Sequence, residues 1–494
     1  MSKRMRVGLV AVVLIIAAFL RFYHFTSTPP GLYPDEAMDG NNAAEAAATG
    51  HFQVFYPEDN GREGLYVNLI ALFLKAWPIH EPWVVRLPAA VAGTLTVLGL
   101  YLLAAELFGF ETGLLAAFLL ATSFWHIDFS RVGFRAILAP LFLTWSFYWL
   151  LKSFHRQRRG RPAYGFAALA GIAYGLGFCS YIAYRVTPLL FLLFIPFFAR
   201  REGFMKKTAV FIVCTFIVAA PLGYYFVAHP ADFFGRTSEI AVTNGANPAR
   251  DFAVNLAKTF LMFNVKGDGN WRHNISGAPE LIWPVGLLFI LGIGIAAAAL
   301  ARRRKERAGT ETRSDNERFG LWLAVSWLIL AAIPAAASNE SIPHALRSIL
   351  MLPPAIMLAA IGGIWLYRLL STHGHLRAAR VMGALFLVAM ALVAYYDYFV
   401  VWGENPNVAG AFNENYVDIG RAINRLPAST PKYVIVSAGD VFARGVPVMA
   451  ETTMFMTDSF TAEGQAAKNI HYLLPSQTGS IPPGTPSSSV FNIN

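Results

Sequence analysis

The carboxylates that follow the first apolar run are the side chains best suited to chemistry in this chain. Asp35 and Glu36 come directly after Pro34, and residues 36–48 have a helix-forming composition. Because a proline restricts the backbone around it, Asp35 is expected at or near a helix amino terminus. There its carboxylate can either cap the helix or serve as a general base toward a substrate hydroxyl or amine. The same segment also carries Asp39, Glu45, Glu58, Asp59 and Glu63.

The composition places these carboxylates in a polytopic membrane protein. The chain has 494 residues, of which 55% are hydrophobic and 14% are charged, and its mean hydropathy is +0.46. Its net charge is +10, but the basic residues form short clusters between apolar runs, which is typical of cytoplasmic loops and argues against nucleic-acid binding. Cys179 and Cys214 lie inside apolar runs and predict buried free thiols. Residues 7–20 lack a small-residue cleavage site and predict a retained anchor.

The order of apolar runs and basic clusters predicts the path of the chain through the membrane. Placing the basic clusters in the cytoplasm puts the amino terminus inside and residues 21–64 outside. An odd number of spans must then separate residues 21–64 from Lys152–Arg161, so residues 65–77 are expected to form an interfacial helix. The other clusters are Lys3–Arg6, Arg200–Lys207, Arg302–Arg307 and Arg377–Arg380. The eleven predicted spans are residues 7–20, 86–108, 113–127, 135–152, 163–184, 186–199, 208–228, 281–301, 319–338, 348–370 and 381–402.

The carboxyl-terminal part of the chain reads as a separate extracytoplasmic region. Residues 416–426 have the apolar spacing of a short helix, and residues 433–437 resemble a buried strand. A small α/β region over 403–474 is therefore expected on the outer side of a transmembrane domain formed by residues 1–402. Residues 475–494 are rich in Ser, Pro, Gly and Thr and are expected to be disordered.

The motifs of the first half of the chain resemble those of family 39 glycosyltransferases. The resemblance is carried by PGLYPDEA, GREGLYVNLIALFLKAW and EPWVVRLPAAVAGTLTVLGLYLLAAELFG. Further similar segments are SFWHIDFSRVGFRAILAP, SYIAYRVTPL, GNWRHNISGAP and IPHALRSILMLPP, which resemble an uncharacterised bacterial branch of this family. The resemblance covers roughly residues 7–370 and is most specific over 29–108. It implies an all-α GT-C fold of the protein O-mannosyltransferase and aminoarabinose transferase type, with the active site in the first outer loop, residues 21–85.

The resemblance also implies an activity and its partners. Such an enzyme transfers one monosaccharide, with inversion, from a polyprenyl-phosphate carrier in the bilayer to an extracytoplasmic acceptor. The acceptor could be a protein, lipid A or another glycolipid, and the membrane would be a bacterial inner or plasma membrane. A lipid-linked donor requires no nucleotide cofactor, and none of the glycine clusters in the chain has the form of a phosphate-binding loop.

Several residues acquire expected roles from this resemblance. Asp35 is the expected general base, and Glu36 is expected to support it by fixing the loop or contacting the acceptor. The donor phosphate calls for guanidinium groups, which can bind its oxygens through paired hydrogen bonds. An arginine at a membrane boundary can equally be a snorkelling anchor. The candidate ligands for the donor phosphate and lipid are Arg131, Arg135, Tyr184, Arg185, Arg272, His344 and Arg347.

A divalent metal ion is a candidate cofactor under the same resemblance. Glu63 begins the second interfacial helix, where some relatives place a metal-binding carboxylate, and His273 could complete a site with it near Asp35. Family members differ in metal dependence, however, and many carry a His-Pro pair where this chain has Arg62-Glu63-Gly64. Several relatives also have an aspartate where this chain has Arg135. The candidate substitutes for that second carboxylate are Asp128, Asp268 and Glu340.

A transporter or flippase of a lipid-linked substrate is the alternative function. Such proteins carry charged residues in mid-membrane helices or broken half-helices, whereas Glu106, Lys152 and Asp397 lie near the ends of predicted spans. The concentration of carboxylates in one outer loop favours surface chemistry over a transport path. A polymerase or ligase of long glycans shares the architecture, but is not expected to carry Pro-Asp-Glu directly after the first span.

Overall fold

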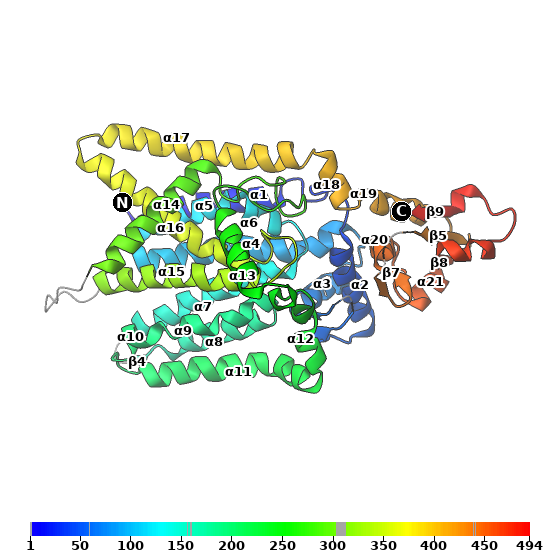
Figure 1. Cartoon of the computed structure of the whole chain (residues 1–494), viewed down its shortest axis with the longest axis horizontal. Helices are drawn as coiled ribbons and strands as arrows, with labels where there is room; N and C mark the ends of the chain where they lie inside the picture. The colour runs from blue at the N-terminus through cyan, green and yellow to red at the C-terminus, as the bar shows by residue number, and fades with distance from the viewer. Residues whose placement is uncertain are drawn as a thin grey trace.

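The fold was obtained as a computed structural model that describes residues 2–58, 60–155, 157–158, 161–302, 313–437, 439 and 441–494. Asp59 and parts of the expected basic clusters Lys152–Arg161 and Arg302–Arg307 lie outside the described residues. Long helices form a bundle, and α2, α3 and the carboxyl-terminal region lie at one end of it (Figure 1). We call this end the loop-rich end.

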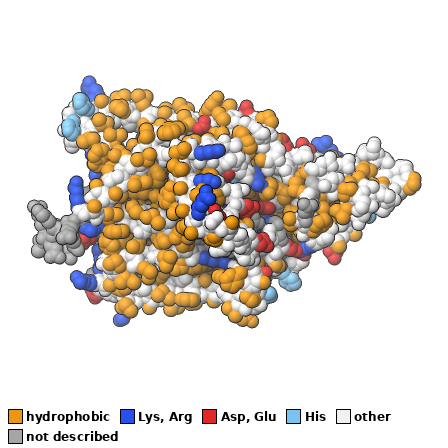
Figure 2. Space-filling view, viewed as in Figure 1, with side chains coloured by type: hydrophobic (Ala, Val, Ile, Leu, Met, Phe, Trp, Pro, Cys, Tyr) orange, Lys and Arg blue, Asp and Glu red, His pale blue; other side chains and the backbone are white. Residues whose placement is uncertain are grey.

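Membrane-length helices make up most of the bundle. Within the described residues, eight helices are long and apolar enough to cross a membrane. Apolar side chains cover the visible face of the bundle, and acidic side chains gather where it meets the carboxyl-terminal region (Figure 2). The eight are α1 (Lys3–Phe22), α4 (Pro82–Phe108), α7 (Leu138–His155) with the turn before it, α11 (Phe204–Ala228), α14 (Trp283–Ala301), α15 (Arg313–Ala336), α16 (Leu352–Thr372) with the turn before it, and α17 (Leu376–Tyr395) with its π-helical continuation Tyr396–Trp402.

The three remaining expected spans correspond to shorter apolar helices. Residues 113–127 fall on α5 (Phe110–Ala121) and α6 (Phe124–Phe129), and residues 163–184 fall on α8 (Tyr164–Phe178). Residues 186–199 fall on α9 (Pro188–Phe191) and α10 (Phe194–Phe198). The helical membrane architecture is thus confirmed, whereas the count of eleven stays a prediction. Two further helices, α12 (Pro230–Glu239) and α13 (Pro248–Leu261), precede α14, and a two-stranded turn of β3 (Gln157–Arg158) and β4 (Arg161–Pro162) precedes α8.

Small residues let neighbouring helices of the bundle approach closely. A Cβ atom built on Gly292 of α14 would lie 1.9 Å from the carbonyl oxygen of Leu358 in α16. A Cβ on Gly362 of α16 would in turn lie 2.2 Å from the Leu288 carbonyl oxygen of α14. Membrane helices gain much of their packing energy from such close backbone contact. These two glycines therefore set the spacing of α14 and α16.

The first loop folds into two helices joined by a small hairpin. Helix α2 (Pro34–Thr49) begins at a proline and ends at Gly50, whose φ of 78° is left-handed and favours glycine. The hairpin pairs β1 (Phe55–Tyr56) with β2 (Arg62–Glu63). Helix α3 (Leu65–Ala76) has 12 residues, fewer than the roughly 20 needed to cross the hydrocarbon core. The position and length of α3 agree with the interfacial helix predicted over 65–77.

The carboxyl-terminal region contains a three-stranded sheet. Its strand order is β8-β5-β9, and both outer strands are parallel to β5. The expected strand and helix are present as β5 (Lys432–Val436) and α19 (Glu414–Asn424). The other elements are α18 (Pro406–Ala411), β6 (Phe442–Ala443), β7 (Val446–Pro447), α20 (Glu451–Thr457), α21 (Ala462–Lys468), β8 (Ile470–Leu473) and β9 (Val490–Ile493).

The prediction that residues 475–494 are disordered is wrong at the end of the chain, where Val490–Ile493 form strand β9. Strand β9 pairs with β5 in the register Tyr433 to Val490, and the Ile493 side chain is fully buried. The composition of the segment is dominated by Ser and Pro, which concealed a short strand that completes the sheet. Open backbone groups on a strand edge favour such an addition.

The carboxyl-terminal region rests on the first loop. The Asn41 Nδ2 atom of α2 donates hydrogen bonds to Glu451 Oε2 at 2.6 Å and to the Glu451 carbonyl oxygen at 3.0 Å, and both side chains are buried. The Thr452 hydroxyl donates to the Leu32 carbonyl oxygen at 2.7 Å. Helix α2 is therefore held between the bundle and α20.

Candidate functional site

A buried carboxylate fixes the start of α2 against the bundle. Glu36 Oε1 accepts hydrogen bonds from Arg86 Nε at 2.9 Å and from the Gly133 N–H at 2.6 Å. Glu36 Oε2 accepts from Arg86 Nη2 at 3.1 Å and from the Tyr33 N–H at 3.2 Å. The Glu36 side chain is 0% exposed. We call Glu36, Arg86 and the two backbone N–H groups the glutamate brace.

Arg86 also ties down the segment that leads into α2. Its Nη1 donates to the Pro29 carbonyl oxygen at 2.7 Å, and its Nη2 donates to the Gly31 carbonyl oxygen at 2.9 Å. The sequence analysis assigned no role to Arg86. Its place at the start of the apolar run 86–108 was the available signal that its charge would be buried and paired. Buried charges in proteins are almost always paired, so a charged partner from another segment could have been expected.

Asp35 lies beside the glutamate brace and differs from it in exposure. Its side chain is 50% exposed, and its Oδ1 atom lies 4.0 Å from Arg62 Nη2. Arg62 Nε lies 3.1 Å from Asp39 Oδ1, and those two side chains are buried. The cap position of α2 is Tyr33, so Asp35 lies within the first turn, where the helix dipole favours a negative charge. Asp35 therefore presents an accessible carboxylate at the start of α2.

Glu63 contacts two of the predicted phosphate ligands. Its Oε2 atom lies 3.0 Å from Arg135 Nε, and its Oε1 atom lies 3.8 Å from Arg185 Nη2. The Arg135 and Arg185 side chains are 23% and 26% exposed. The Arg185 guanidinium also lies 4.2 Å from the centre of the Phe233 ring. Glu63 thus holds two arginines from different loops at one place.

Two other predicted phosphate ligands are enclosed by the protein. Arg131 is 0% exposed, and its Nη atoms donate to the carbonyl oxygens of Leu20, His24 and Thr28 at 2.7–3.2 Å. Tyr184 is also 0% exposed, and within the described part of the chain its hydroxyl has no hydrogen-bond partner. In this structure Arg131 ties the end of α1 to the bundle, and neither side chain reaches the surface.

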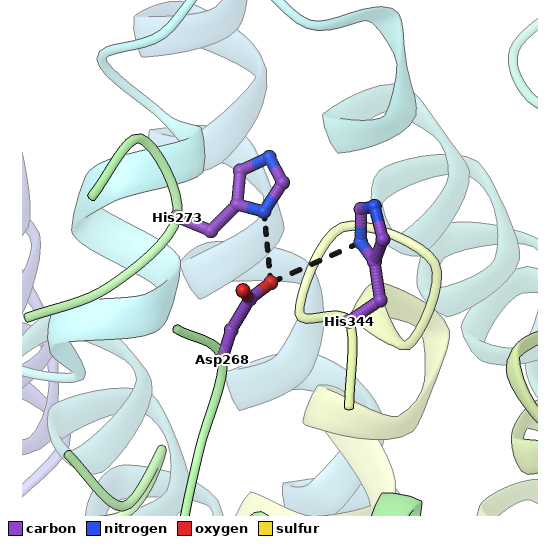
Figure 3. Close-up of side chains that lie close together, drawn as sticks. All are labelled: Asp268, His273 and His344. Atoms are coloured by element: carbon purple, nitrogen blue, oxygen red, sulfur yellow. Dashed lines mark hydrogen bonds and ion pairs between the residues drawn. The ribbon is translucent and has the colours of Figure 1, made fainter. Parts of the chain in front are cut away.

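Two loops far apart in sequence bring an aspartate and two histidines together. His273 Nδ1 is hydrogen-bonded to Asp268 Oδ2 at 2.8 Å, and His344 Nδ1 lies 3.9 Å from the same oxygen. Figure 3 shows both imidazole rings turned toward the carboxylate, and their centres are 4.8 Å apart. One ligand atom from each residue lies within 4.8 Å of the others. We call Asp268, His273 and His344 the triad.

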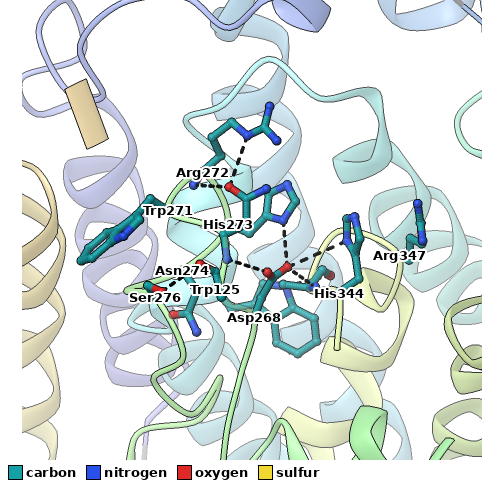
Figure 4. A network of polar contacts seen from close by, with 12 residues as sticks. Trp125, Asp268, Trp271, Arg272, His273, Asn274, Ser276, His344 and Arg347 are labelled. Carbon is teal, nitrogen blue, oxygen red and sulfur yellow. Dashed lines mark hydrogen bonds and ion pairs between the residues drawn. The ribbon is translucent and has the colours of Figure 1, made fainter. Parts of the chain in front are cut away.

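Backbone groups hold the triad carboxylate in place. Asp268 Oδ2 accepts a hydrogen bond from the Ala345 N–H at 2.8 Å, and Oδ1 accepts from the Asn270 N–H at 2.8 Å. The Ala345 carbonyl oxygen in turn accepts from Trp125 Nε1 of α6 at 3.2 Å. Figure 4 shows the labelled side chains of the two loops gathered around Asp268, with Trp125 beside them. The Asp268 carboxylate is therefore held by its own loop and by the Ala345 loop, which Trp125 of α6 supports in turn.

Arg272 connects the triad loop to the start of α2. Its guanidinium carbon lies 3.6 Å from the centre of the Tyr33 ring, and Tyr33 immediately precedes Pro34 and Asp35. Burial lowers the pKa of Arg272 to about 10, so its guanidinium remains protonated at neutral pH. The structure thus brings one predicted phosphate ligand close to the helix that carries Asp35.

Two further candidate site residues, Arg347 and Asp128, are buried in the protein. Arg347 is buried, pairs with Glu340 Oε2 at 2.5 Å and donates to the Glu340 carbonyl oxygen at 2.8 Å. Asp128 is 0% exposed, and neither of its carboxyl oxygens has a hydrogen-bond partner among the described residues. Because its side chain is enclosed by the protein, Asp128 does not reach a substrate at the surface.

The donor set of the triad fits a transition-metal ion. Two imidazoles and one carboxylate are ligands that zinc accepts, and a catalytic zinc site uses three protein ligands with one position left open. Glu63 and His273 were predicted to share one metal site, but the structure does not bring these two residues together. Among the described residues, His273 groups with Asp268 and His344, whereas Glu63 belongs to no such group. Glu63 instead forms ion pairs with Arg135 and Arg185.

The loop-rich end therefore combines three kinds of group. Asp35 offers an accessible carboxylate, Arg135, Arg185 and Arg272 offer guanidinium groups, and the triad offers metal ligands. Sequence reasoning named all of these residues. It could not predict that His344 lies beside Asp268, because the two residues come from loops separated by two membrane helices.

Part of the chain matches a known protein family. Residues 66–225, less than half of the chain, match the family described as dolichyl-phosphate-mannose-protein mannosyltransferase. A comparison with curated proteins finds no match.

Solved structures with the same fold include membrane glycosyltransferases. ArnT from Cupriavidus metallidurans, solved bound to undecaprenyl phosphate, is 12% identical with a TM-score of 0.57, over 100% of this chain and 90% of that chain. The oligosaccharyltransferase AglB from Archaeoglobus fulgidus, solved with an inhibitory peptide and a dolichol-phosphate, is 14% identical with a TM-score of 0.54. That match covers 96% of this chain and 65% of AglB, so the chain spans less than two thirds of the archaeal protein.

A third structure, of the Archaeoglobus fulgidus oligosaccharyltransferase with zinc and sulfate, is 14% identical with a TM-score of 0.53, over 95% of this chain and 62% of that chain. At such identities the likeness is one of fold. The resemblance that the motifs indicated is thus shown by a partial family match and by shared architecture. Membrane-length helices and these relatives together identify the chain as an integral membrane protein with the GT-C glycosyltransferase fold.

Proposed function

We propose that this protein transfers a monosaccharide from a polyprenyl-phosphate carrier to an acceptor at its loop-rich end. The observation that supports this most is the stacking of Arg272 on Tyr33, which lies two residues before Asp35 and its accessible carboxylate. A candidate phosphate ligand from a distant loop thereby contacts the segment that leads into the candidate base. The ArnT structure was solved with undecaprenyl phosphate and the AglB structure with dolichol-phosphate, which is the class of carrier that we propose here.

The proposed reaction is a single displacement at the anomeric carbon of the sugar. Asp35 takes the proton of an acceptor hydroxyl or amine as the acceptor atom bonds to the anomeric carbon. The bond between that carbon and the phosphate oxygen breaks, and the oxygen keeps the electron pair. Attack from the face opposite the leaving phosphate inverts the anomeric configuration. Asp35 needs access to the acceptor for this step, which its half-exposed side chain supports.

Guanidinium groups would stabilise the charge that develops on the leaving phosphate. Arg272 is placed beside α2, and Arg135 and Arg185 are partly exposed and oriented by Glu63. Preorganised positive groups at a developing charge lower a reaction barrier more than flexible ones. Glu63 therefore acts as a positioning residue in this proposal, because it orients two arginines from different loops.

Glu36 is proposed as a positioning residue. The glutamate brace uses both oxygens of Glu36 on Arg86 and on two backbone N–H groups. Its carboxylate has no exposed surface with which to contact an acceptor. Its proposed contribution is to set the direction in which the neighbouring Asp35 points.

The triad is the proposed holder of a divalent metal ion. Asp268, His273 and His344 would bind it, and such an ion supplies positive charge that stabilises a phosphate leaving group. The buried, hydrogen-bonded Asp268 supports this role, because a metal carboxylate is commonly oriented by a second set of hydrogen bonds.

The proposed orientation places the loop-rich end outside the cytoplasm. Lys3, Arg4 and Arg6 begin α1, and Arg200 and Arg201 follow α10. In Figure 2 basic side chains lie at the end of the bundle opposite the carboxyl-terminal region. Because cytoplasmic loops are enriched in Lys and Arg, this distribution supports an amino terminus in the cytoplasm.

Sugar transfer by the purified full-length protein in lipid tests the proposal. A panel of labelled polyprenyl-phosphate sugars is offered, and consumption of each donor is followed for wild type and Asp35→Asn. We expect wild type to consume one donor and Asp35→Asn to lose about 10²-fold or more of the rate, as for removal of a general base. Asp418→Asn is the control, because this carboxylate in the carboxyl-terminal region is 68% exposed.

Two outcomes would contradict the proposal. One is that Asp35→Asn consumes the donor as fast as Asp418→Asn does. The other is that wild type binds polyprenyl phosphate but consumes no donor in a broad panel, which would favour a transporter or flippase.

A further inference from the structure

A cavity of about 180 Å³ lies among α5, α14, α16 and α17, beside the segment 274–282. Its walls are mostly apolar and include Leu119, Ile356 and Met390. An apolar cavity of roughly 150 Å³ can bind a benzene molecule. This cavity is therefore large enough for a segment of hydrocarbon chain, although not for a whole lipid.

One carboxylate in the cavity wall is buried and only partly satisfied. Glu280 is 4% exposed. Its Oε1 atom accepts hydrogen bonds from the Asp268 N–H at 2.9 Å and from Asn274 Nδ2 at 3.1 Å. Its Oε2 atom has no hydrogen-bond partner among the described residues. An unsatisfied buried oxygen of this kind costs free energy unless a ligand donates to it.

A second carboxylate lines the same cavity. Asp397 belongs to the π-helical end of α17 and is half-buried. Within the described ranges it makes no hydrogen bond or ion pair. The lining contains no Lys, Arg or His side chain. The ionisable side chains that line the cavity are therefore acidic, and the complementary ligand carries a positive charge.

The surroundings of the cavity indicate where that ligand comes from. Helices α14 and α17 are membrane-length, and their exposed faces carry apolar side chains such as Leu287 and Leu385, which are 58% and 63% exposed. The cavity is therefore bordered by helices that face lipid. A molecule that enters it from this side has a hydrocarbon chain.

We propose that this cavity binds a lipid whose hydrocarbon chain contacts the apolar walls and whose primary ammonium group pairs with Glu280 and Asp397. An anionic donor phosphate is disfavoured here, because the lining offers no basic side chain that could pair with it. The site is thus distinct from the guanidinium groups near α2. It communicates with the triad loop directly, since Glu280 Oε1 accepts from the N–H of Asp268.

The test uses three probes that share a chain and differ in the head group: ω-bromoundecylamine, ω-bromoundecanol and ω-bromoundecanoic acid. Bromine quenches tryptophan fluorescence on contact, and Trp283 lines the cavity. The full-length protein is titrated in a nonionic detergent, and the Trp283 contribution is the difference between wild type and Trp283→Phe. We expect the amine to quench at a concentration roughly tenfold or more below that of the alcohol, the effect of one hydrogen bond to a charged group. The acid is expected to bind more weakly still.

Variants of the two carboxylates separate this site from general partitioning into detergent. Asp397→Asn and Glu280→Gln should each weaken the amine by about tenfold and leave the alcohol unchanged. Glu404→Gln is the matched control, because Glu404 is an exposed carboxylate near the same helix end and does not line the cavity. Because Trp283 is itself 59% exposed, detergent-dissolved probes can quench it without entering the cavity. Ala394→Phe, which places a ring inside the cavity, should therefore remove the tighter quenching by the amine and leave the weaker quenching that all three probes share.

The proposal is overturned if the amine binds no more tightly than the alcohol or the acid. It is also overturned if Asp397→Asn, which breaks no contact in the described part of the chain, binds the amine as wild type does. Tighter quenching by the amine that persists in a folded Ala394→Phe protein would place the amine outside the cavity and contradict the proposal as well.

Discussion

The glutamate brace and the triad are both buried charged clusters at the loop-rich end, but they are built differently. In the brace, both oxygens of Glu36 are engaged by a guanidinium group and by backbone N–H groups. Arginine stays charged and offers only hydrogen-bond donors. In the triad, Asp268 faces two imidazoles, each of which can donate, accept or bind a metal. The brace is suited to fixing the backbone, whereas the triad is suited to exchanging a ligand.

The same contrast separates Glu36 from its neighbour Asp35. The two carboxylates are adjacent on α2, but one is 0% exposed and the other is 50% exposed. Adjacent residues of a helix point in different directions. A single turn can therefore supply both a structural anchor and an accessible base. Substitutions and a metal titration test this separation of roles, beginning with the largest expected effect.

Removing the brace carboxylate should cost the most stability. Glu36→Ala leaves the buried Arg86 guanidinium without its charged partner, which typically lowers the free energy of unfolding by about 3–5 kcal/mol. The matched change Asp35→Ala removes an accessible carboxylate and should alter stability by about 0.5 kcal/mol or less. Denaturant unfolding in micelles measures both. Equal losses in the two variants would show that Glu36 is no more of an anchor than Asp35.

Zinc should stabilise the protein through the triad. At a free concentration about a hundredfold above its Kd, one bound ion adds about 2.7 kcal/mol to the free energy of unfolding. We expect this gain in wild type and its loss in the His273→Ala/His344→Ala double variant. His471→Ala is the control, because this histidine lies on β8 in the carboxyl-terminal region. A zinc-induced shift in Tm that is the same in all three proteins would assign the ion to another place.

Arg272 should contribute its positive charge to donor binding. Burial lowers the pKa of Arg272 to about 10, so the guanidinium group is charged at neutral pH. Arg272→Met should therefore lower the affinity for polyprenyl phosphate at neutral pH by about 1.5–3 kcal/mol, the contribution of a hydrogen bond to a charged group. Equilibrium binding of polyprenyl phosphate to the purified protein measures the difference. A variant that keeps the wild-type affinity would exclude Arg272 as the phosphate ligand.

A solvent-exposed ion pair should contribute least. Arg444 lies 2.7 Å from Glu45 and 2.7 Å from Glu58, and its side chain is 38% exposed. Exposed pairs of this kind contribute about 1 kcal/mol or less. Arg444→Gln should therefore lower the free energy of unfolding by no more than that, and high salt should reduce the difference. A loss as large as that of Glu36→Ala would mean that docking of the carboxyl-terminal region dominates the stability of the first loop.

Sequence patterns predicted the elements better than the contacts between them. The runs of apolar residues and the limited length of 65–77 predicted the membrane helices and α3, because hydrophobic length is a local property. The end of the chain was predicted incorrectly, since Val490–Ile493 gain their partner only from β5. The structure also does not bring Glu63 and His273 together, because the position of Arg135 and Arg185 beside Glu63 depends on how the loops fold.

The sequence by itself determined that this is a helical membrane protein with a carboxylate-rich first loop and a set of arginines and histidines in its other loops. Composition, apolar length and motif order are readable residue by residue, because they do not depend on distant partners. Only the tertiary structure decided which carboxylates are buried in internal ion pairs and which remain accessible. The exposure of Asp35, the burial of Glu36 and the meeting of Asp268 with His273 and His344 arise from contacts between segments far apart in the chain. The free energy of a buried charge depends on those contacts, and no local pattern records them.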